Sequence, residues 1–244
     1  MKAMLVDENE NLVWTDVADP IIKEDEVLIK IHAAALPEVY ATSYLNLFLE
    51  GHLKEGQTVF IPAGASGLAS VATPMAKAFS ARVITSVRRE ETIETVKAWG
   101  ADVVIHATTQ SVEEVLKQEE EKGTPVNVSM DCLSGETLGK SLPYMARGGY
   151  WIVIATLAGT ETTVQLRPLL TKGLHLVGST LRSRTPEFKA FILSELVEKV
   201  WPKIECGAIK PSIYKVLPIE QADEAHAIMA RSQHIGKVVL KVSQ

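Results

Sequence analysis

VFIPAGASGLASVATPMAKAF (residues 59–79) is the stretch that decides the fold, because an apolar strand runs through small residues straight into a helix. The strand pattern covers 58–63, and the turn and helix cover 64–79. Small residues let the backbone approach a pyrophosphate closely, and the helix N-terminus then offers N–H donors to the phosphates. The predicted turn residues are Gly64, Ala65, Ser66, Gly67 and Leu68. The alternative is a tight turn that binds nothing.

The same alternation of strand and helix continues on the C-terminal side of this turn. Apolar strand patterns recur at 81–86, 101–107, 126–132, 150–156 and 173–180. Two charged helical patterns lie between the first three of these strands, at 88–100 and 111–123, and each ends at a glycine. Strands that alternate with helices at this spacing predict βαβ units, so we expect an α/β protein with a doubly wound parallel sheet.

The two flanks of this region have different patterns. The first 36 residues favour short strands, at 1–6 and 26–36, and a helix is expected over 37–50. After Thr180 the regular alternation ends. A long helix begins near Pro186, and a strand at 213–218, a helix at 219–233 and a last strand at 236–242 follow.

Composition excludes several classes of protein. Hydrophobic residues make up 46% of the 244 residues and charged residues 23%, as in a globular protein with a sizeable core. The net charge of −5 argues against a nucleic-acid partner. Two cysteines cannot form a disulfide scaffold, which favours a reducing, cytoplasmic location. We expect no membrane partner, because the sequence has neither a secretory signal nor an apolar run of membrane-spanning length.

The end of the strand at 81–86, the second strand of the alternation that begins at 58–63, indicates which type of dinucleotide would bind. Turns specific for NAD place an acidic residue there for the ribose hydroxyls. This chain has Ser86, Arg88 and Arg89 instead, with no acid before Glu90. A guanidinium group suits a 2′-phosphate, and a serine can donate a hydrogen bond to it, which favours NADPH over NADH. The alternative is that both arginines are surface residues without a ligand.

At these residues the chain resembles the zinc-free quinone oxidoreductases (zeta-crystallin-like) of the medium-chain dehydrogenase/reductase superfamily. The stretches that carry the resemblance occur in family order: LPEVYATSYLNLF (36–48), VFIPAGASGL (59–68), VSMDCLSG (128–135), GGYWIVIATLAG (148–159), STLRSR (179–184) and HIGKVVL (234–240).

The resemblance implies the domain organisation and the assembly. Residues 37–184 would form a Rossmann-like dinucleotide-binding domain. Residues 1–36 and 185–244 would form the remnant of a truncated, β-rich GroES-like catalytic domain, because family chains are longer between Ala35 and Pro37. Many relatives pair through the edge of the sixth strand, so a homodimer is expected.

The resemblance also implies which residues line the cofactor. Loops at the ends of the fourth, fifth and sixth strands would surround the nicotinamide and its ribose. With Thr42 on the helix before the nucleotide domain, the implied contacts there are Cys132, Thr156, Leu157, Thr180, Leu181 and Arg182. No metal site is expected, because Glu38 stands where zinc-dependent relatives hold a cysteine.

Function stays open among three hypotheses. The first is an NADPH-dependent reductase that transfers hydride to a quinone or enone, with no catalytic side chain assigned. The second is a non-catalytic NADPH-binding module, because the missing stretch holds most of the family's substrate cleft. The third is an inactive truncated homologue. Turnover with a small quinone separates the first from the second, and loss of all nucleotide binding favours the third.

Overall fold

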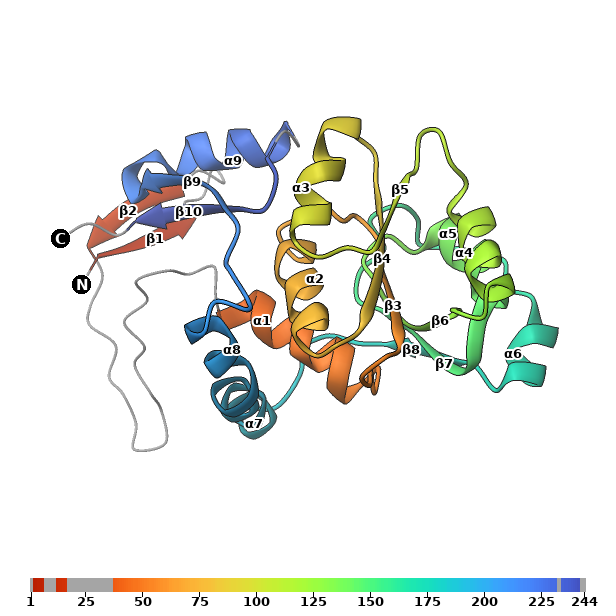
Figure 1. Ribbon diagram of the computed structural model, residues 1–244. Helices are drawn as coiled ribbons and strands as arrows, with labels where there is room; N and C mark the ends of the chain where they lie inside the picture. The colour runs from red at the N-terminus through yellow and green to blue at the C-terminus, as the bar shows by residue number, and fades with distance from the viewer. Residues whose placement is uncertain (1, 7–11, 17–36, 232–233, 242–244) are drawn as a thin grey trace.

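A six-stranded sheet forms the centre of the molecule (Figure 1). The computed structural model describes residues 2–6, 12–16, 37–231 and 234–241. The strands lie in the order β5-β4-β3-β6-β7-β8, and every neighbouring pair is parallel. Their bounds are β3 Thr58–Ile61, β4 Arg82–Val87, β5 Val103–His106, β6 Val126–Asp131, β7 Met145–Val153 and β8 His175–Gly178. This confirms the predicted Rossmann-like α/β fold.

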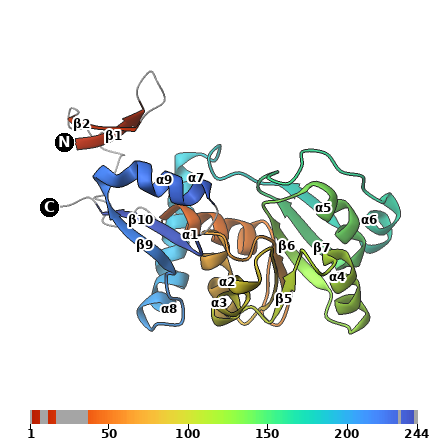
Figure 2. The same ribbon diagram turned by 90° about the horizontal axis from the view of Figure 1, so that it is seen from above.

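Helices cover both faces of the sheet, as Figure 2 shows from above. On one face lie α1 Pro37–Tyr44, with its π-helical continuation Leu45–Leu49, α2 Ala69–Ala78 and α3 Ile93–Ala98, which follows the 3-10 turn Glu90–Thr92. On the other lie α4 Val112–Glu121, α5 Gly135–Ser141, the 3-10 turn Leu142–Tyr144 and α6 Leu166–Lys172. A sheet covered on both faces needs strands that are apolar on both sides.

Strand β3 shows how the sequence meets that need. Successive side chains of a strand point to opposite faces. Val59 and Ile61 pack in the core beneath α1 and α2, and Phe60 packs with Trp151 in the core beneath α4 and α5. All three side chains are buried. The uninterrupted apolar run therefore encodes a central strand.

The C-terminal part begins with a helical segment and ends in a small sheet. Helix α7 Pro186–Glu195 continues through the π-helical turn Leu196–Val200 into α8 Trp201–Glu205. Strand β9 Ile213–Pro218 pairs in parallel with β10 Lys237–Lys241, and the 3-10 turn Ile219–Gln221 and α9 Ala222–Ala230 lie between them in the chain. Near the N-terminus, β1 Lys2–Val6 and β2 Leu12–Asp16 form an antiparallel pair.

Helix α7 packs against α1, across the expected boundary after Arg184. Ile192 and Leu196 belong to the same buried cluster as Tyr40, and the Tyr44 hydroxyl donates to Glu195 Oε2 over 2.8 Å. Burial and this hydrogen bond to Glu195 raise the pKa of Tyr44 to about 12, so the hydroxyl remains a donor at neutral pH. The division into two domains stays a prediction.

Several elements differ from the sequence expectation. Strand β7 begins five residues before Tyr150, because Gly148 (φ 69°) and Gly149 form an irregularity that resembles a loop in the sequence. Helices α5 and α6 and strand β2 were not expected, and the glycines of α5 hide it from a periodicity argument. The expected strand at 26–36 lies outside the described residues.

Pro74 lies inside α2, in its second turn, and the side chain is buried. A proline has no N–H, so the carbonyl of Ser70 loses its helical partner. The helix begins at Ala69 and runs on past the proline to Ala78. The helix buries four side chains in the core: Val71, Ala72, Met75 and Ala76. This packing indicates that their burial outweighs the loss of one helical hydrogen bond at Pro74.

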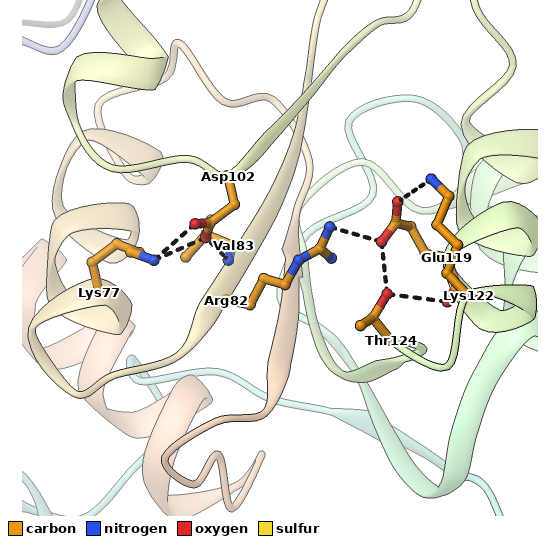
Figure 3. Close-up of polar contacts among 7 residues, drawn as sticks. All are labelled: Lys77, Arg82, Val83, Asp102, Glu119, Lys122 and Thr124. Carbon is orange, nitrogen blue, oxygen red and sulfur yellow. Dashed lines mark hydrogen bonds and ion pairs between the residues drawn. The ribbon is translucent and has the colours of Figure 1, made fainter.

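Two polar clusters tie helices to the amino end of the sheet (Figure 3). Asp102, just before β5, accepts from the Val83 N–H over 2.7 Å and pairs with Lys77 of α2 at 3.0 Å. Glu119 of α4 is 3% exposed, pairs with Arg82 of β4 at 2.7 Å, and accepts from the Thr124 hydroxyl over 2.9 Å. Burial alone would raise the pKa of Glu119, but hydrogen bonds from Lys122 and Thr124 and the charge of Arg82 lower it below 4.5.

The substitution Glu119→Gln should lower the free energy of unfolding at neutral pH by about 2 kcal/mol, because the half-buried Arg82 loses its counter-ion. The folded-state pKa is depressed, so this stability is present at neutral pH and is lost as the pH falls through the folded-state value. On acidification, the urea midpoint of the wild type should therefore fall more than the urea midpoint of the variant.

The matched control is Glu136→Gln, which removes an exposed ion pair with Lys140 on the helix surface. It should leave the urea midpoint unchanged. Equal midpoints for Glu119→Gln and wild type at neutral pH would show that the buried cluster contributes nothing net.

Candidate active site at the carboxyl edge of the sheet

The order of the strands places a ligand crevice between β3 and β6. Chain connections run outward from β3 to β4 and β5 on one side, and from β6 to β7 and β8 on the other. In open parallel sheets, ligands bind outside the carboxyl ends of the strands at such a switch point. The glycine turn follows β3 and Cys132 follows β6, so the two predicted segments face this crevice from both sides.

The glycine turn is held by close backbone contacts. The Gly64 N–H donates to the Ser86 carbonyl over 2.7 Å, and a Cβ at Gly64 would lie 2.2 Å from Thr85 Oγ1. Only glycine therefore fits beside β4 at this position. Ser66 Oγ accepts from the Ala69 N–H over 3.1 Å at the start of α2. The turn thus leads directly into a helix N-terminus, where anions bind favourably.

A cavity of about 490 Å³ opens at this edge. It brings together seven of the residues singled out from the sequence: Thr42, Gly67, Leu68, Cys132, Thr180, Leu181 and Arg182. They come from α1, the glycine turn and the segments after β6 and β8. The remaining lining residues are Glu38, Val39, Asn46, Ile154, Ala155, Ser179, Met229, His234, Gly236, Lys237 and Val238.

The other predicted residues do not line this cavity. Gly64, Ala65 and Ser66 form the preceding part of the turn, and Ser86 is buried at the end of β4. Arg88 is exposed beyond that strand. Arg89 donates to the His234 carbonyl over 3.2 Å and lies 3.6 Å from Glu91. Their roles toward a cofactor stay predictions.

Thr156 and Leu157 lie beyond β7, also outside the cavity. Both are exposed to solvent, and the Leu157 N–H donates to the Cys132 carbonyl over 3.2 Å. Their expected contact with a nicotinamide ribose likewise stays a prediction.

The C-terminal segment closes over the glycine turn, which sequence reasoning did not foresee. The Gly236 N–H donates to the Ala65 carbonyl over 3.3 Å, and a Cβ at Gly67 would lie 3.0 Å from Lys237 Cδ. Lys237 is thereby placed beside the start of α2. Its position in the stretch HIGKVVL, which carried the family resemblance, is the signal that could have singled it out.

Besides the exposed Arg182, two charged residues of opposite sign line the cavity, Lys237 and Glu38. Burial lowers the pKa of Lys237, and the nearby Glu38 carboxylate acts in the other direction. Glu38 Oε1 accepts from the Thr42 hydroxyl over 2.8 Å. An ammonium that is half removed from water gains from an anionic ligand, so the residues present fit a phosphate group at this end of the cavity.

The turn after β6 is organised by the buried carboxylate of Asp131. Its Oδ1 accepts from the N–H groups of Leu133 and Ser134 over 2.8 and 2.9 Å, and its Oδ2 accepts from Trp151 Nε1 over 2.8 Å. Cys132 is thereby held at the wall of the cavity. Burial and the charge of Asp131 raise the pKa of its thiol to about 11, so it is a neutral wall residue and not a nucleophile.

Within the described ranges, no group of three or more histidine, cysteine, aspartate or glutamate side chains is arranged to hold a metal ion. None of the described helices combines the length and apolar character that crossing a membrane requires.

Comparison with known proteins identifies the family. Residues 67–198 match the family described as zinc-binding dehydrogenase. The chain is 30% identical to a quinone oxidoreductase-like protein 2 homolog of Nematostella vectensis, over 87% of this chain and 58% of that protein.

Two solved structures show the same fold. A 2-haloacrylate reductase is 26% identical over 91% of this chain and 69% of its own, with a TM-score of 0.76. A mycobacterial protein complexed with NADPH is 26% identical over 86% and 63%, with a TM-score of 0.71. The chain thus spans little more than half of the curated relative. It belongs to the zinc-binding dehydrogenase family and is a quinone oxidoreductase-like member of the medium-chain dehydrogenase/reductase superfamily.

Proposed function

We propose that the protein binds NADPH at the carboxyl edge of its sheet and reduces a quinone or enone. The observation that carries the proposal is the cavity at the strand-order switch, with Gly67, Lys237 and the start of α2 at one end. The similarity to a quinone oxidoreductase-like protein, a 2-haloacrylate reductase and an NADPH-bound structure supports it.

In this proposal each part of the site has one task. The glycine turn and the N-terminus of α2 take the pyrophosphate, and Lys237 neutralises its charge. Arg88 and Ser86, at the end of β4, contact the 2′-phosphate. Bound NADPH supplies the hydride. The residues at the ends of β6, β7 and β8 orient the nicotinamide and keep water away from it, and the acceptor is a small conjugated carbonyl compound.

A non-catalytic NADPH-binding module is the second candidate. It is favoured by the short connection between Ala35 and Pro37, where longer family members carry most of the substrate cleft. Binding without turnover would identify it. A zinc-free protein and a cytoplasmic location are part of both candidates; they rest on Glu38 at the position of a zinc-ligand cysteine and on the two unpaired cysteines.

Titration of the purified protein with NADPH and NADH, followed by nucleotide fluorescence, tests the first step. We expect saturable binding that is tighter for NADPH. Addition of a small quinone should then oxidise the bound cofactor. Binding without oxidation selects the non-catalytic module, and absence of saturable binding of either nucleotide overturns both candidates.

The substitution Arg88→Ala should weaken NADPH binding roughly tenfold and leave NADH binding unchanged, because only NADPH carries the 2′-phosphate. Arg147→Ala is the matched control, since Arg147 is also exposed but lies toward the amino end of β7. An equal loss of affinity for both nucleotides would contradict a 2′-phosphate contact.

We also propose a homodimer formed through the β8 edge. Strand β8 pairs only with β7 among the described strands. Exposed leucines lie on the preceding loop, on α6 and on β8 itself: Leu157, Leu166, Leu170 and Leu176. An open strand edge beside exposed apolar side chains favours pairing with a second copy.

Light scattering after size-exclusion chromatography should therefore give the mass of a dimer for the wild type. Leu170 lies on α6 and is 82% exposed, and the Leu170→Glu variant should have a mass closer to that of a monomer. Val197→Glu, on the exposed side of the helical segment after α7, should leave the dimer intact. A wild-type monomer would rule the proposal out.

A further inference from the structure

Helix α1 has one side that is not packed against the rest of the molecule. From Glu38 to Tyr44, only Glu38 and Thr42 are not buried, and these two lie one helical turn apart. Both line the cavity at the carboxyl edge of the sheet. The Thr42 hydroxyl donates to Glu38 Oε1 over 2.8 Å, which holds the carboxylate on this side of the helix. The Glu38 carboxylate therefore lies at the cavity wall.

The effect of Glu38 on Lys237 supports this position independently. The side chain of Lys237 runs beside Gly67, where it also lines the cavity. Burial lowers the pKa of Lys237, and the negative charge of Glu38 partly opposes this effect. The carboxylate on α1 and the ammonium beside the glycine turn are therefore close enough to interact across the cavity.

Glu38 is the only carboxylate among the described residues that line the cavity. The lining cations are Lys237 and Arg182. In the proposed binding mode the pyrophosphate neutralises Lys237, and Arg182 is exposed, with no hydrogen bond that fixes its guanidinium to a described residue. The Thr42 hydroxyl, by contrast, fixes the charge of Glu38. A ligand in the cavity is therefore subject to one fixed negative charge that its own phosphates do not neutralise.

The proposed binding mode brings the nicotinamide ring into the same cavity. With the pyrophosphate at the glycine turn, the nicotinamide half of the dinucleotide extends over the ends of β6, β7 and β8. Cys132, Ile154 and Thr180 follow these three strands, and all three line the cavity. The ring and the Glu38 carboxylate then share a volume of about 490 Å³. Because Coulomb energy falls only with the first power of distance, a charge on the wall acts on a charge anywhere inside.

The nicotinamide ring changes its charge in the proposed reaction. Bound NADPH transfers a hydrogen with both electrons of a C–H bond to the acceptor, which also takes up a proton from water, and the ring keeps one positive charge. We propose that the Glu38 carboxylate stabilises this positive charge, so that the protein favours NADP⁺ over NADPH and makes the bound cofactor a stronger hydride donor. The same field stabilises a transition state in which part of the charge has developed. This inference rests on the proposed NADPH binding and adds a residue that acts through its charge.

The test compares the affinities for the two redox forms of the cofactor by calorimetry. Glu38→Gln keeps an oxygen that accepts from Thr42 and removes only the charge. It should weaken NADP⁺ binding about three- to tenfold relative to NADPH binding, because only the oxidised ring is cationic. Glu38→Lys should shift the ratio of the two dissociation constants further in the same direction, because it places a positive charge at the same position.

The ratio also separates this role from a structural one. A carboxylate in the first turn of a helix interacts favourably with the helix dipole, and Glu38 has such a position. Loss of that interaction, or release of Lys237 from Glu38, would change both affinities by the same factor, because NADP⁺ and NADPH carry the same phosphates. Glu187→Gln is the matched control: Glu187 is an exposed carboxylate in the first turn of α7 and does not line the cavity. It should leave the ratio unchanged.

The outcomes distinguish this inference from the proposed function. If Glu38→Gln leaves the ratio of the two dissociation constants as in the wild type, the inference is wrong, while NADPH binding stands. If the wild type binds neither redox form, the proposed function itself has failed. The comparison requires no turnover, so it applies equally to a non-catalytic module.

Discussion

The buried carboxylate of Asp131 is the interaction on which the carboxyl edge of the sheet depends. A fully buried carboxylate must be compensated by hydrogen bonds, and Asp131 accepts three, from two backbone N–H groups of the next turn and from Trp151 on β7. It thereby joins the ends of β6 and β7 and sets the course of the chain after β6. The wall of the cavity at Cys132 follows from this geometry.

Opposite this wall, the cavity is closed by a segment from the far end of the chain. The backbone at Gly236 hydrogen-bonds to Ala65, and Lys237 lies across Gly67, where a larger residue would meet its side chain. The small residues of the turn therefore allow two close contacts: Gly64 lies against β4, and Gly67 lies against Lys237 at the start of β10. A site built in this way places a cation beside the helix N-terminus, where a phosphate is best bound.

Much of the fold could be predicted because it is encoded locally. The run 59–61 is apolar throughout, which is typical of a strand covered on both faces, and β9 was predicted with its observed bounds. Helix α5 was missed because GETLGKS has weak helical propensity and forms through the burial of Leu138. Strand β7 was predicted too short because its glycine irregularity is stabilised by pairing with β6, which no local pattern reveals.

For the candidate site, the sequence by itself determined the glycine turn, the helix that follows it and the strand ends that face a ligand, because these depend on residue size and on periods of two and 3.6 residues. Only the tertiary structure decided which residues share the cavity. Lys237 lies far from the glycine turn in the chain, and its ammonium becomes significant only when packing partly removes it from water. Burial and partnership are properties of the folded chain, and no local pattern specifies them.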